Sequence, residues 1–296
     1  MGGKYLKNEG FSEDVCLAVA EHYLPSFYKD ALPSSKYGAI VSVADKIETL
    51  ISIFISGKRP SGSSDPYALR RNLNGVIKII WDYELDLPLE KLFNELIDFW
   101  KIEFPNLDFS KKEVLNDLIE FLVQRIVSHL EEISLSKELI KALYSSDEFS
   151  QKRILNIVDL KNRVKSIVNF KEKETFFEIQ KVITRVSKLA NSSNLSTEVL
   201  SIGDYVNTKL FEKDCELKVF EFIKELEKLY SKGSCDYLKL LNLFEININT
   251  IEDLFDNEKG VLVMTEDIKV RNNRLNLLSL IRNYSLKIAD FTLLNS

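Results

Sequence analysis

The sequence predicts an all-α protein, and three observations support this prediction. Apolar residues recur at spacings of three and four along most of the 296 residues, and no useful length alternates apolar with polar residues. Ser, Thr, Asp and Pro stand where several of these stretches begin, as they do at helix N-termini. All six prolines lie at or before position 105, and only three glycines follow it. The long second part of the chain therefore contains few residues that break helices.

The first expected helix covers residues 12–24. It begins at Ser12 with two acidic residues in its first turn, which suits the positive end of the helix dipole, and Pro25 ends it. The next expected helix, 37–56, is apolar on almost every side, so it should lie at the centre of its domain. Asp45 and Lys46 fall in its middle, and we expect them to form a buried pair or to face a groove.

A loop and a helix start follow, and they carry the first candidate site. Residues 60–64 cannot continue the apolar pattern that ends near Gly57, Asp65 is a suitable N-cap, and Pro66 suits the first helical position. Free N–H groups at a helix start between cations can hold a phosphate. The cations that flank this loop are Lys58, Arg59, Arg70 and Arg71. The alternative is an ordinary capped helix with solvated basic ends.

The remaining pattern is helical to the end. Expected helices cover 65–81, 88–102, 110–130, 135–145, 148–168, 173–190, 214–231, 234–243, 248–256 and 266–290. The last of them is expected to begin at Thr265, with two acidic residues in its first turn and several cations along its length.

Composition excludes several classes of protein. The net charge is −5, which excludes a globally basic nucleic-acid binder but leaves room for a local basic patch. Three distant cysteines without a CxxC pair suit a reducing cytosol and argue against a zinc site, so we expect a cytoplasmic protein. His22 and His129 are the only histidines, too few for a metal site of several imidazoles. No signal peptide and no membrane-spanning run is recognisable.

Six segments, in order along the chain, resemble the β subunit of the bacterial two-subunit glycyl-tRNA synthetase. They are Glu21–Pro25, Asp45–Leu50, Gly57–Arg71, Val263–Asp267, Arg271–Leu275 and Ala289–Phe291. The resemblance covers only the C-terminal part of that longer subunit, so we expect a fragment or a truncated product. It implies part of an HD-like helical domain (1–104), a helical linking region (105–165) and a helical-bundle anticodon-binding domain of the DALR-like kind (166–296).

The same resemblance implies a function. In this family the α subunit is thought to hold the ATP and glycine site, and the β subunit mainly binds tRNA, within an α2β2 tetramer. The expected partners are glycine tRNA and the α subunit, with no membrane. We expect no catalytic residue, metal or cofactor in this chain, whereas the whole enzyme uses ATP and magnesium.

Binding of tRNA requires cations for phosphates, and aromatic or arginine side chains on which unpaired bases stack. Besides the loop cations, the candidates for charge are Arg185, Lys188, Arg271, Arg274 and Arg282, and those for stacking are Tyr205 and Tyr284. The alternative for each of them is a solvated side chain or one that forms an ion pair with a neighbour.

Two further hypotheses remain open. His22 and Asp45 resemble remnants of the HD pattern, so a metal-dependent phosphohydrolase is the second candidate function, although HD enzymes need more ligands than these. The alternative is a packed histidine at a helix end. The third candidate is a scaffold for subunit assembly that does not contact RNA.

Overall fold

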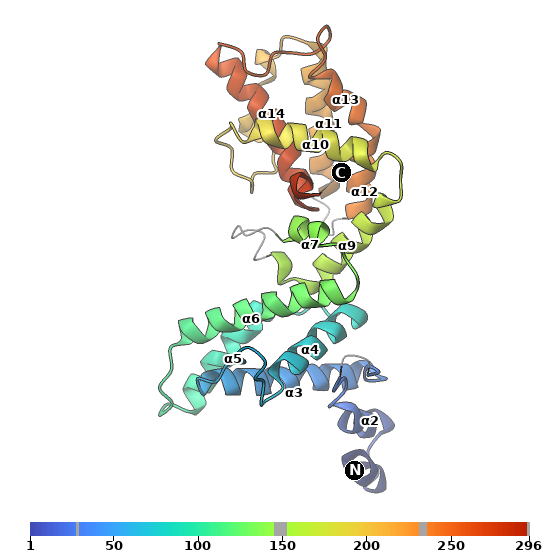
Figure 1. Cartoon of the computed structure of the whole chain (residues 1–296), viewed down its shortest axis with the longest axis vertical. Coiled ribbons are helices and arrows are strands. Elements are labelled where there is room, and N and C mark those ends of the chain that lie inside the picture. The colour runs from blue at the N-terminus through green and yellow to red at the C-terminus, as the bar shows by residue number, and fades with distance from the viewer. Residues whose placement is uncertain (28–29, 145–152, 231–235, 295–296) are drawn as a thin grey trace. The chain divides into compact units, whose positions relative to one another are not determined.

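The computed structural model describes residues 1–27, 30–144, 153–230 and 236–294 (Figure 1). These residues form α-helices and short 3-10 helices without a strand, which confirms the all-α prediction. The chain divides into two compact units. Unit 1 comprises Met1–Ser136 and Ser146–Lys161, and unit 2 comprises Lys137–Ser145 and Asn162–Ser296. The domain limits expected from the resemblance, 1–104, 105–165 and 166–296, stay a prediction.

Unit 1 is organised around the helix that the sequence places at its centre. Its helices are α1 (Gly2–Asn8), α2 (Glu13–Glu21), α3 (Lys36–Ile55), α4 (Leu69–Tyr83), α5 (Leu89–Glu103) and α6 (Lys111–Glu132). Helix α3 packs against α2, α4, α5 and α6 (Figure 1). Its side chains Ile47, Ile51 and Phe54 are almost completely buried. Gly57, at a φ of +80°, follows the end of α3, where a residue without Cβ turns the chain at little cost.

The two charged residues in the middle of α3 do not form the buried pair expected from the sequence. Asp45 is exposed, whereas Lys46 is only 3% exposed. The Nζ atom of Lys46 donates to the carbonyl oxygens of His22, Tyr23 and Leu24, at 3.3, 3.0 and 3.2 Å. These carbonyls follow the end of α2, where a cation is favoured. Burial lowers the pKa of the Lys46 ammonium.

The start of α4 also differs from the prediction. The helix begins at Leu69, because Ala68 is left-handed, with a φ of 56°, and interrupts the turn that Asp65 was expected to begin. The Asp65 carboxylate still accepts hydrogen bonds from the backbone N–H groups of Leu69 and Arg70, at 2.8 and 3.0 Å. It therefore satisfies the free donors of this helix from a position outside it.

Unit 2 is built around two helices that cross. Its helices are α7 (Lys137–Leu143), α10 (Phe176–Ala190), α11 (Asp214–Tyr230), α12 (Tyr237–Ile246), α13 (Ile248–Asp253) and α14 (Ile268–Leu286), with 3-10 helices η1 (Gly203–Tyr205), η2 (Thr208–Leu210) and η3 (Phe291–Leu293). Figure 1 shows α10 lying across α14, its most extensive partner. The residues of α9 (Ile157–Lys171) are divided between the two units.

Helix limits in this part shift by a few residues. Helix α14 is capped by Asp267, whose carboxylate accepts from the N–H groups of Lys269 and Val270, rather than by Thr265. Parts of the expected helices 135–145, 148–168, 214–231 and 234–243 lie outside the described residues. No helix within the described part of the chain is long and apolar enough to cross a membrane.

Candidate nucleic-acid interface

A groove of about 610 Å³ runs along the exposed face of α10. Its lining comes from α10 and from the segment after α14: Phe177, Gln180, Lys181, Thr184, Arg185, Lys188, Thr292 and Leu294. Three of these residues are cationic and none is acidic. Lys181, Arg185 and Lys188 are exposed, and none of them forms an ion pair with the residues that the structure describes. The groove is therefore a positively charged surface that is open to an anion.

The amphipathic pattern of α10 explains why these cations share one face. Val182, Ile183 and Val186 are buried on the opposite face. Residues three and four apart lie together on a helix, so Lys181, Arg185 and Lys188 form one stripe. Arg185 and Lys188 were predicted from the sequence, whereas Lys181 was not, although its i,i+4 spacing to Arg185 indicates it.

The groove also contains an exposed aromatic ring. Phe177 is 56% exposed, although a phenylalanine is usually buried. It lies four positions before Lys181 and eight before Arg185, on the same stripe. An aromatic ring beside cations is the combination on which unpaired bases stack while their phosphates are held. Phe177 was not predicted from the sequence either.

Arg185 borders a second depression. Its guanidinium carbon lies 4.2 Å from the centre of the Phe255 ring, which holds the side chain over that residue. The depression, of about 380 Å³, is lined by Arg185, Leu189, Phe255, Asp256, Asn257, Gly260 and the segment 261–264. Arg185 therefore lines both the groove and this depression, with its guanidinium over the Phe255 ring.

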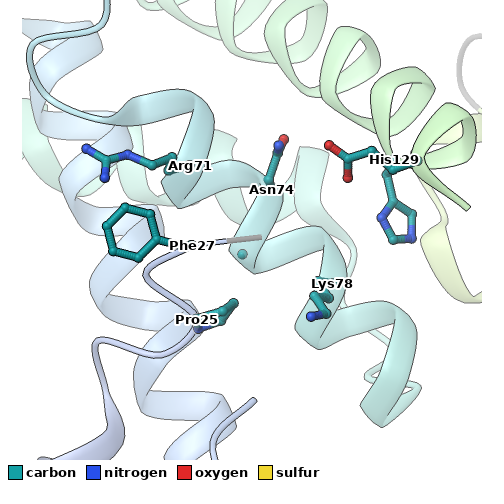
Figure 2. A pocket seen from close by; sticks show the side chains of 8 residues that line it. Pro25, Phe27, Arg71, Asn74, Lys78 and His129 are labelled. Carbon is teal, nitrogen blue, oxygen red and sulfur yellow. The ribbon is translucent and has the colours of Figure 1, made fainter. Parts of the chain in front are cut away.

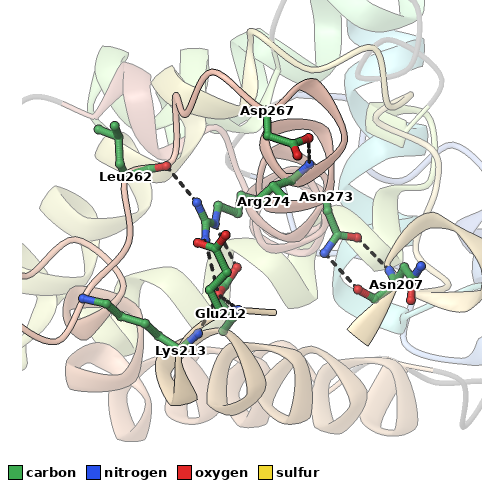
Figure 3. Close-up of polar contacts among 9 residues, drawn as sticks. Asn207, Glu212, Lys213, Leu262, Asp267, Asn273 and Arg274 are labelled. Carbon is green, nitrogen blue, oxygen red and sulfur yellow. Dashed lines mark hydrogen bonds and ion pairs between the residues drawn. The ribbon is translucent and has the colours of Figure 1, made fainter. Parts of the chain in front are cut away.

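Arg274 was expected to contact RNA, and this prediction is wrong. The side chain is buried, and its Nε and Nη2 atoms form ion pairs with Glu216, at 2.9 Å, and with Glu212, at 2.6 Å (Figure 3). Its Nη1 atom donates to the Leu262 carbonyl at 3.1 Å. Each of its three guanidinium nitrogens donates a hydrogen bond inside unit 2, so it stabilises the fold.

Arg282 and Tyr284 are also buried, so neither can contact RNA directly as the sequence suggested. The Arg282 guanidinium donates to the carbonyl oxygens of Ala190 and Leu195, both at 3.1 Å, and burial lowers its pKa. The Tyr284 hydroxyl donates to the Leu200 carbonyl at 2.6 Å, and burial raises its pKa. Both side chains therefore hold the segment before η1 in place.

Two other candidates of unit 2 stay predictions. Arg271 is half-buried and donates from Nη1 to the Thr265 carbonyl at 3.3 Å. Tyr205 is 45% exposed, and its ring is available for stacking.

The four cations of the first candidate site do not form one cradle. Lys58 donates to the Tyr67 hydroxyl at 2.6 Å. Arg59 forms an ion pair with Asp117 at 2.8 Å and also donates to the Phe54 carbonyl. Asp65 already accepts from the N–H groups of Leu69 and Arg70, and Arg59 is engaged elsewhere, so the expected phosphate cradle does not form at the start of α4. The tRNA contacts expected of the four cations stay a prediction.

The other two loop cations lie on α4. Arg70 is half-buried, and Arg71 is exposed, with its guanidinium carbon 5.3 Å from the centre of the Phe27 ring. Lys58 and Arg71 therefore remain the accessible cations of this group.

The remnants of the HD pattern do not assemble into a metal site. The Nδ1 atom of His22 lies 2.8 Å from the Val19 carbonyl oxygen, as in a histidine that closes its own helix, and Asp45 points to solvent from α3. Within the described residues, no group of three or more His, Cys, Asp or Glu side chains could hold a metal ion. These positions therefore give no support to a metal-dependent phosphohydrolase.

Comparisons with known proteins agree on one family. The family described as "Glycyl-tRNA synthetase beta subunit" matches residues 1–145. Curated relatives named "Glycine--tRNA ligase beta subunit" match 98% or more of the chain: 34% identity in Trichodesmium erythraeum, 34% in Thermodesulfovibrio yellowstonii and 30% in Clostridioides difficile. The chain spans 40–41% of the length of these relatives.

Proposed function

The chain belongs to the glycyl-tRNA synthetase β-subunit family, and from this we propose that it is a tRNA-binding portion of a glycine–tRNA ligase. In this proposal it supports the ATP-dependent attachment of glycine by positioning tRNA for the α subunit. The ATP, magnesium and glycine chemistry belongs to the whole enzyme, which acts in the cytoplasm as an α2β2 tetramer. This chain supplies cations and aromatic rings instead of catalytic groups.

The observation that supports this proposal best is the groove on α10. A chain with a net charge of −5 repels RNA over most of its surface, so binding requires a place where cations are concentrated and unpaired. Lys181, Arg185 and Lys188 provide that place, and Phe177 adds an exposed ring for an unpaired base. The groove suits single-stranded RNA, because stacking needs a base that is not paired.

The test is a salt titration of the 296-residue chain with glycine tRNA. The variant Lys181→Gln, Arg185→Gln, Lys188→Gln removes the three groove cations. Each lost phosphate contact lowers the slope of log affinity against log salt by about 0.7 for a single strand. We expect the slope to fall by about 2 and the affinity at low salt to fall at least about tenfold.

A matched control distinguishes the loss of the groove cations from the loss of total positive charge. Lys91→Gln, Lys224→Gln, Lys239→Gln removes the same charge from lysines that already pair with Glu95, Glu221 and Asp236. The proposal predicts that this control retains the affinity and the slope. Equal losses in both variants, or no binding of tRNA by the unaltered chain, would contradict it and leave a scaffold for subunit assembly as the better account.

A further inference from the structure

Unit 1 contains a small cavity between the chain after α2, helix α4 and helix α6. Its volume is about 60 Å³. Figure 2 shows the side chains around it: Pro25, Phe27, Arg71, Asn74, Gly75, Lys78, His129 and Glu132. A water molecule needs about 10–15 Å³ of such volume, so the cavity has room for about five heavy atoms. That matches the edge of a planar ring or a small polar molecule.

Two buried polar atoms at this cavity lack a partner. The Asn74 Oδ1 and His129 Nε2 atoms are inaccessible to solvent and form no hydrogen bond with the described residues. His129 is only 7% exposed, and its ring lies edge-on to Trp81 at 5.0 Å between centres. Buried polar atoms almost always have a partner, so these two indicate that something polar enters the cavity.

The third polar group at the cavity is the Glu132 carboxylate, which lines it together with Asn74 and His129. Burial raises the pKa of Glu132 and lowers the pKa of His129, so the imidazole stays neutral near pH 7. An amide, a neutral imidazole and a carboxylate are groups that read the hydrogen-bonding edges of bases.

The mouth of the cavity carries an aromatic ring and cations. Phe27 is 61% exposed, and Arg71 lies over its ring. Lys78 also lines the cavity, and its Nζ atom donates to the Asp30 carbonyl at 3.3 Å. A ring for stacking and cations for a phosphate thus surround an interior that offers hydrogen bonds.

We propose that this cavity takes the hydrogen-bonding edge of one unpaired nucleotide of the RNA, with its base on Phe27 and its phosphate beside Arg71. This inference rests on the proposed function, because it names the part of the tRNA that this second site holds. Asn74 Oδ1 and the Glu132 carboxylate accept hydrogen bonds, so the site favours bases with an exocyclic amino group. Adenine, cytosine and guanine carry that group, and uracil does not.

Binding of mononucleotides tests the inference without tRNA. The chain contains only His22 and His129, so both imidazoles can be followed by NMR, and His22 serves as an internal control. We expect cytidine 5′-monophosphate to shift the His129 signals and leave those of His22 unchanged. Uridine 5′-monophosphate should bind about tenfold more weakly, as expected for one lost hydrogen bond to a buried group. Inorganic phosphate should bind more weakly still.

Two variants remove the unpartnered atoms while keeping the shape. His129→Phe keeps a ring against Trp81, and Asn74→Leu keeps the volume. By calorimetry, Asn74→Leu should lower the affinity for the cytidine nucleotide more than that for the uridine nucleotide, and His129→Phe should lower both affinities. Asn116→Leu, on the exposed face of α6, is the control and should change neither.

Three results would overturn the inference: no shift of His129 with any nucleotide, equal affinity for the cytidine and uridine nucleotides, or equal affinity for inorganic phosphate. If tRNA binds through the α10 groove while the nucleotides do not bind, only this inference fails. If the nucleotides bind as expected while the chain does not bind tRNA, the proposed function fails instead, and the cavity is a nucleotide site of another purpose.

Discussion

Arg274 illustrates how a single residue can be misinterpreted from sequence. Along α14 it stands among polar residues and other cations, which indicates a solvated face. Its partners, Glu216 and Glu212, precede it by 58 and 62 positions, so no local spacing reveals them. Only the packing of α11 against α14 brings the charges together. The same holds for Arg282, whose carbonyl partners lie about 90 positions away.

The pair of Arg274 and Glu216 gives a prediction about stability. Arg274→Met leaves the Glu216 carboxylate, which is 0% exposed, without its cation. Removing one partner of a buried pair lowers the free energy of unfolding by about 3–5 kcal/mol. Urea denaturation followed by circular dichroism measures the loss.

A second substitution identifies the cause. Glu216→Gln retains the acceptor for the N–H groups of Glu212 and Lys213 but removes the charge. Added to Arg274→Met, it should recover more than half of the loss. A double variant no more stable than Arg274→Met would show that lost packing, and not the unpaired charge, causes the effect.

His129 gives a prediction about pH. Burial lowers its pKa in the folded state, and Asp82 opposes this shift while Lys78 adds to it. The unfolded state therefore binds a proton first as the pH falls through 6.5, its ordinary pKa, and the free energy of unfolding decreases. His129→Phe should remove this part of the acid sensitivity.

The measurement is urea denaturation just above and well below pH 6.5. Glu132, which also lines the cavity, acts in the opposite direction, because its raised pKa makes the folded state bind a proton first. The difference between the unaltered chain and His129→Phe isolates the histidine. An identical dependence on pH in both would show that His129 titrates normally in the folded protein.

At the scale of elements, the exposed face of one helix could be predicted from the sequence, and that of another could not. Helix α10 has one apolar stripe, so its exposed face, with Arg185 and Lys188, could be derived from spacing alone. Helix α14 is surrounded by other elements, and most of its residues are buried, including polar ones. Its polar residues form hydrogen bonds and ion pairs with residues far away in the sequence. The sequence pattern of α14 is therefore that of a solvated helix, although the helix is central.

Helix starts show a second limit of sequence reasoning. Asp65 does satisfy the first N–H groups of α4, as an N-cap should, but from three residues before the cap position. The left-handed backbone at Ala68 creates this offset, and an alanine carries no signal for that conformation. The phosphate site expected at this helix start required free backbone N–H groups, but the Asp65 carboxylate already accepts hydrogen bonds from those of Leu69 and Arg70.

At the scale of the whole molecule, the helical class and the central place of α3 could be derived from residue periodicity. The burial of Arg274 and Arg282 could not, since burial depends on which helices meet. The 40 lysines and arginines are spread along the chain among 45 acidic residues. Folding brings Lys181, Arg185 and Lys188 to one groove and withdraws Arg274 and Arg282 from the surface.

The two compact units give a prediction about unfolding. Both tryptophans of the chain, Trp81 and Trp100, lie in unit 1, so tryptophan fluorescence reports on that unit, whereas far-ultraviolet circular dichroism reports on both. Arg274→Met weakens unit 2. If the units unfold separately, this variant should shift the transition seen by circular dichroism to lower urea and leave the fluorescence midpoint unchanged. A shared shift of both midpoints would show one cooperative transition.

The buried polar run of α14 has a consequence for how this protein can diverge. Arg282, Asn283 and Tyr284 hold the segment 195–200 entirely by its main-chain carbonyl oxygens, at Leu195, Ser196, Val199 and Leu200. A main-chain oxygen is the same whatever side chain the residue carries. Substitutions can therefore accumulate in the segment 195–200 without altering its backbone path. Arg282, Asn283 and Tyr284, which hold this segment, are under the stronger constraint.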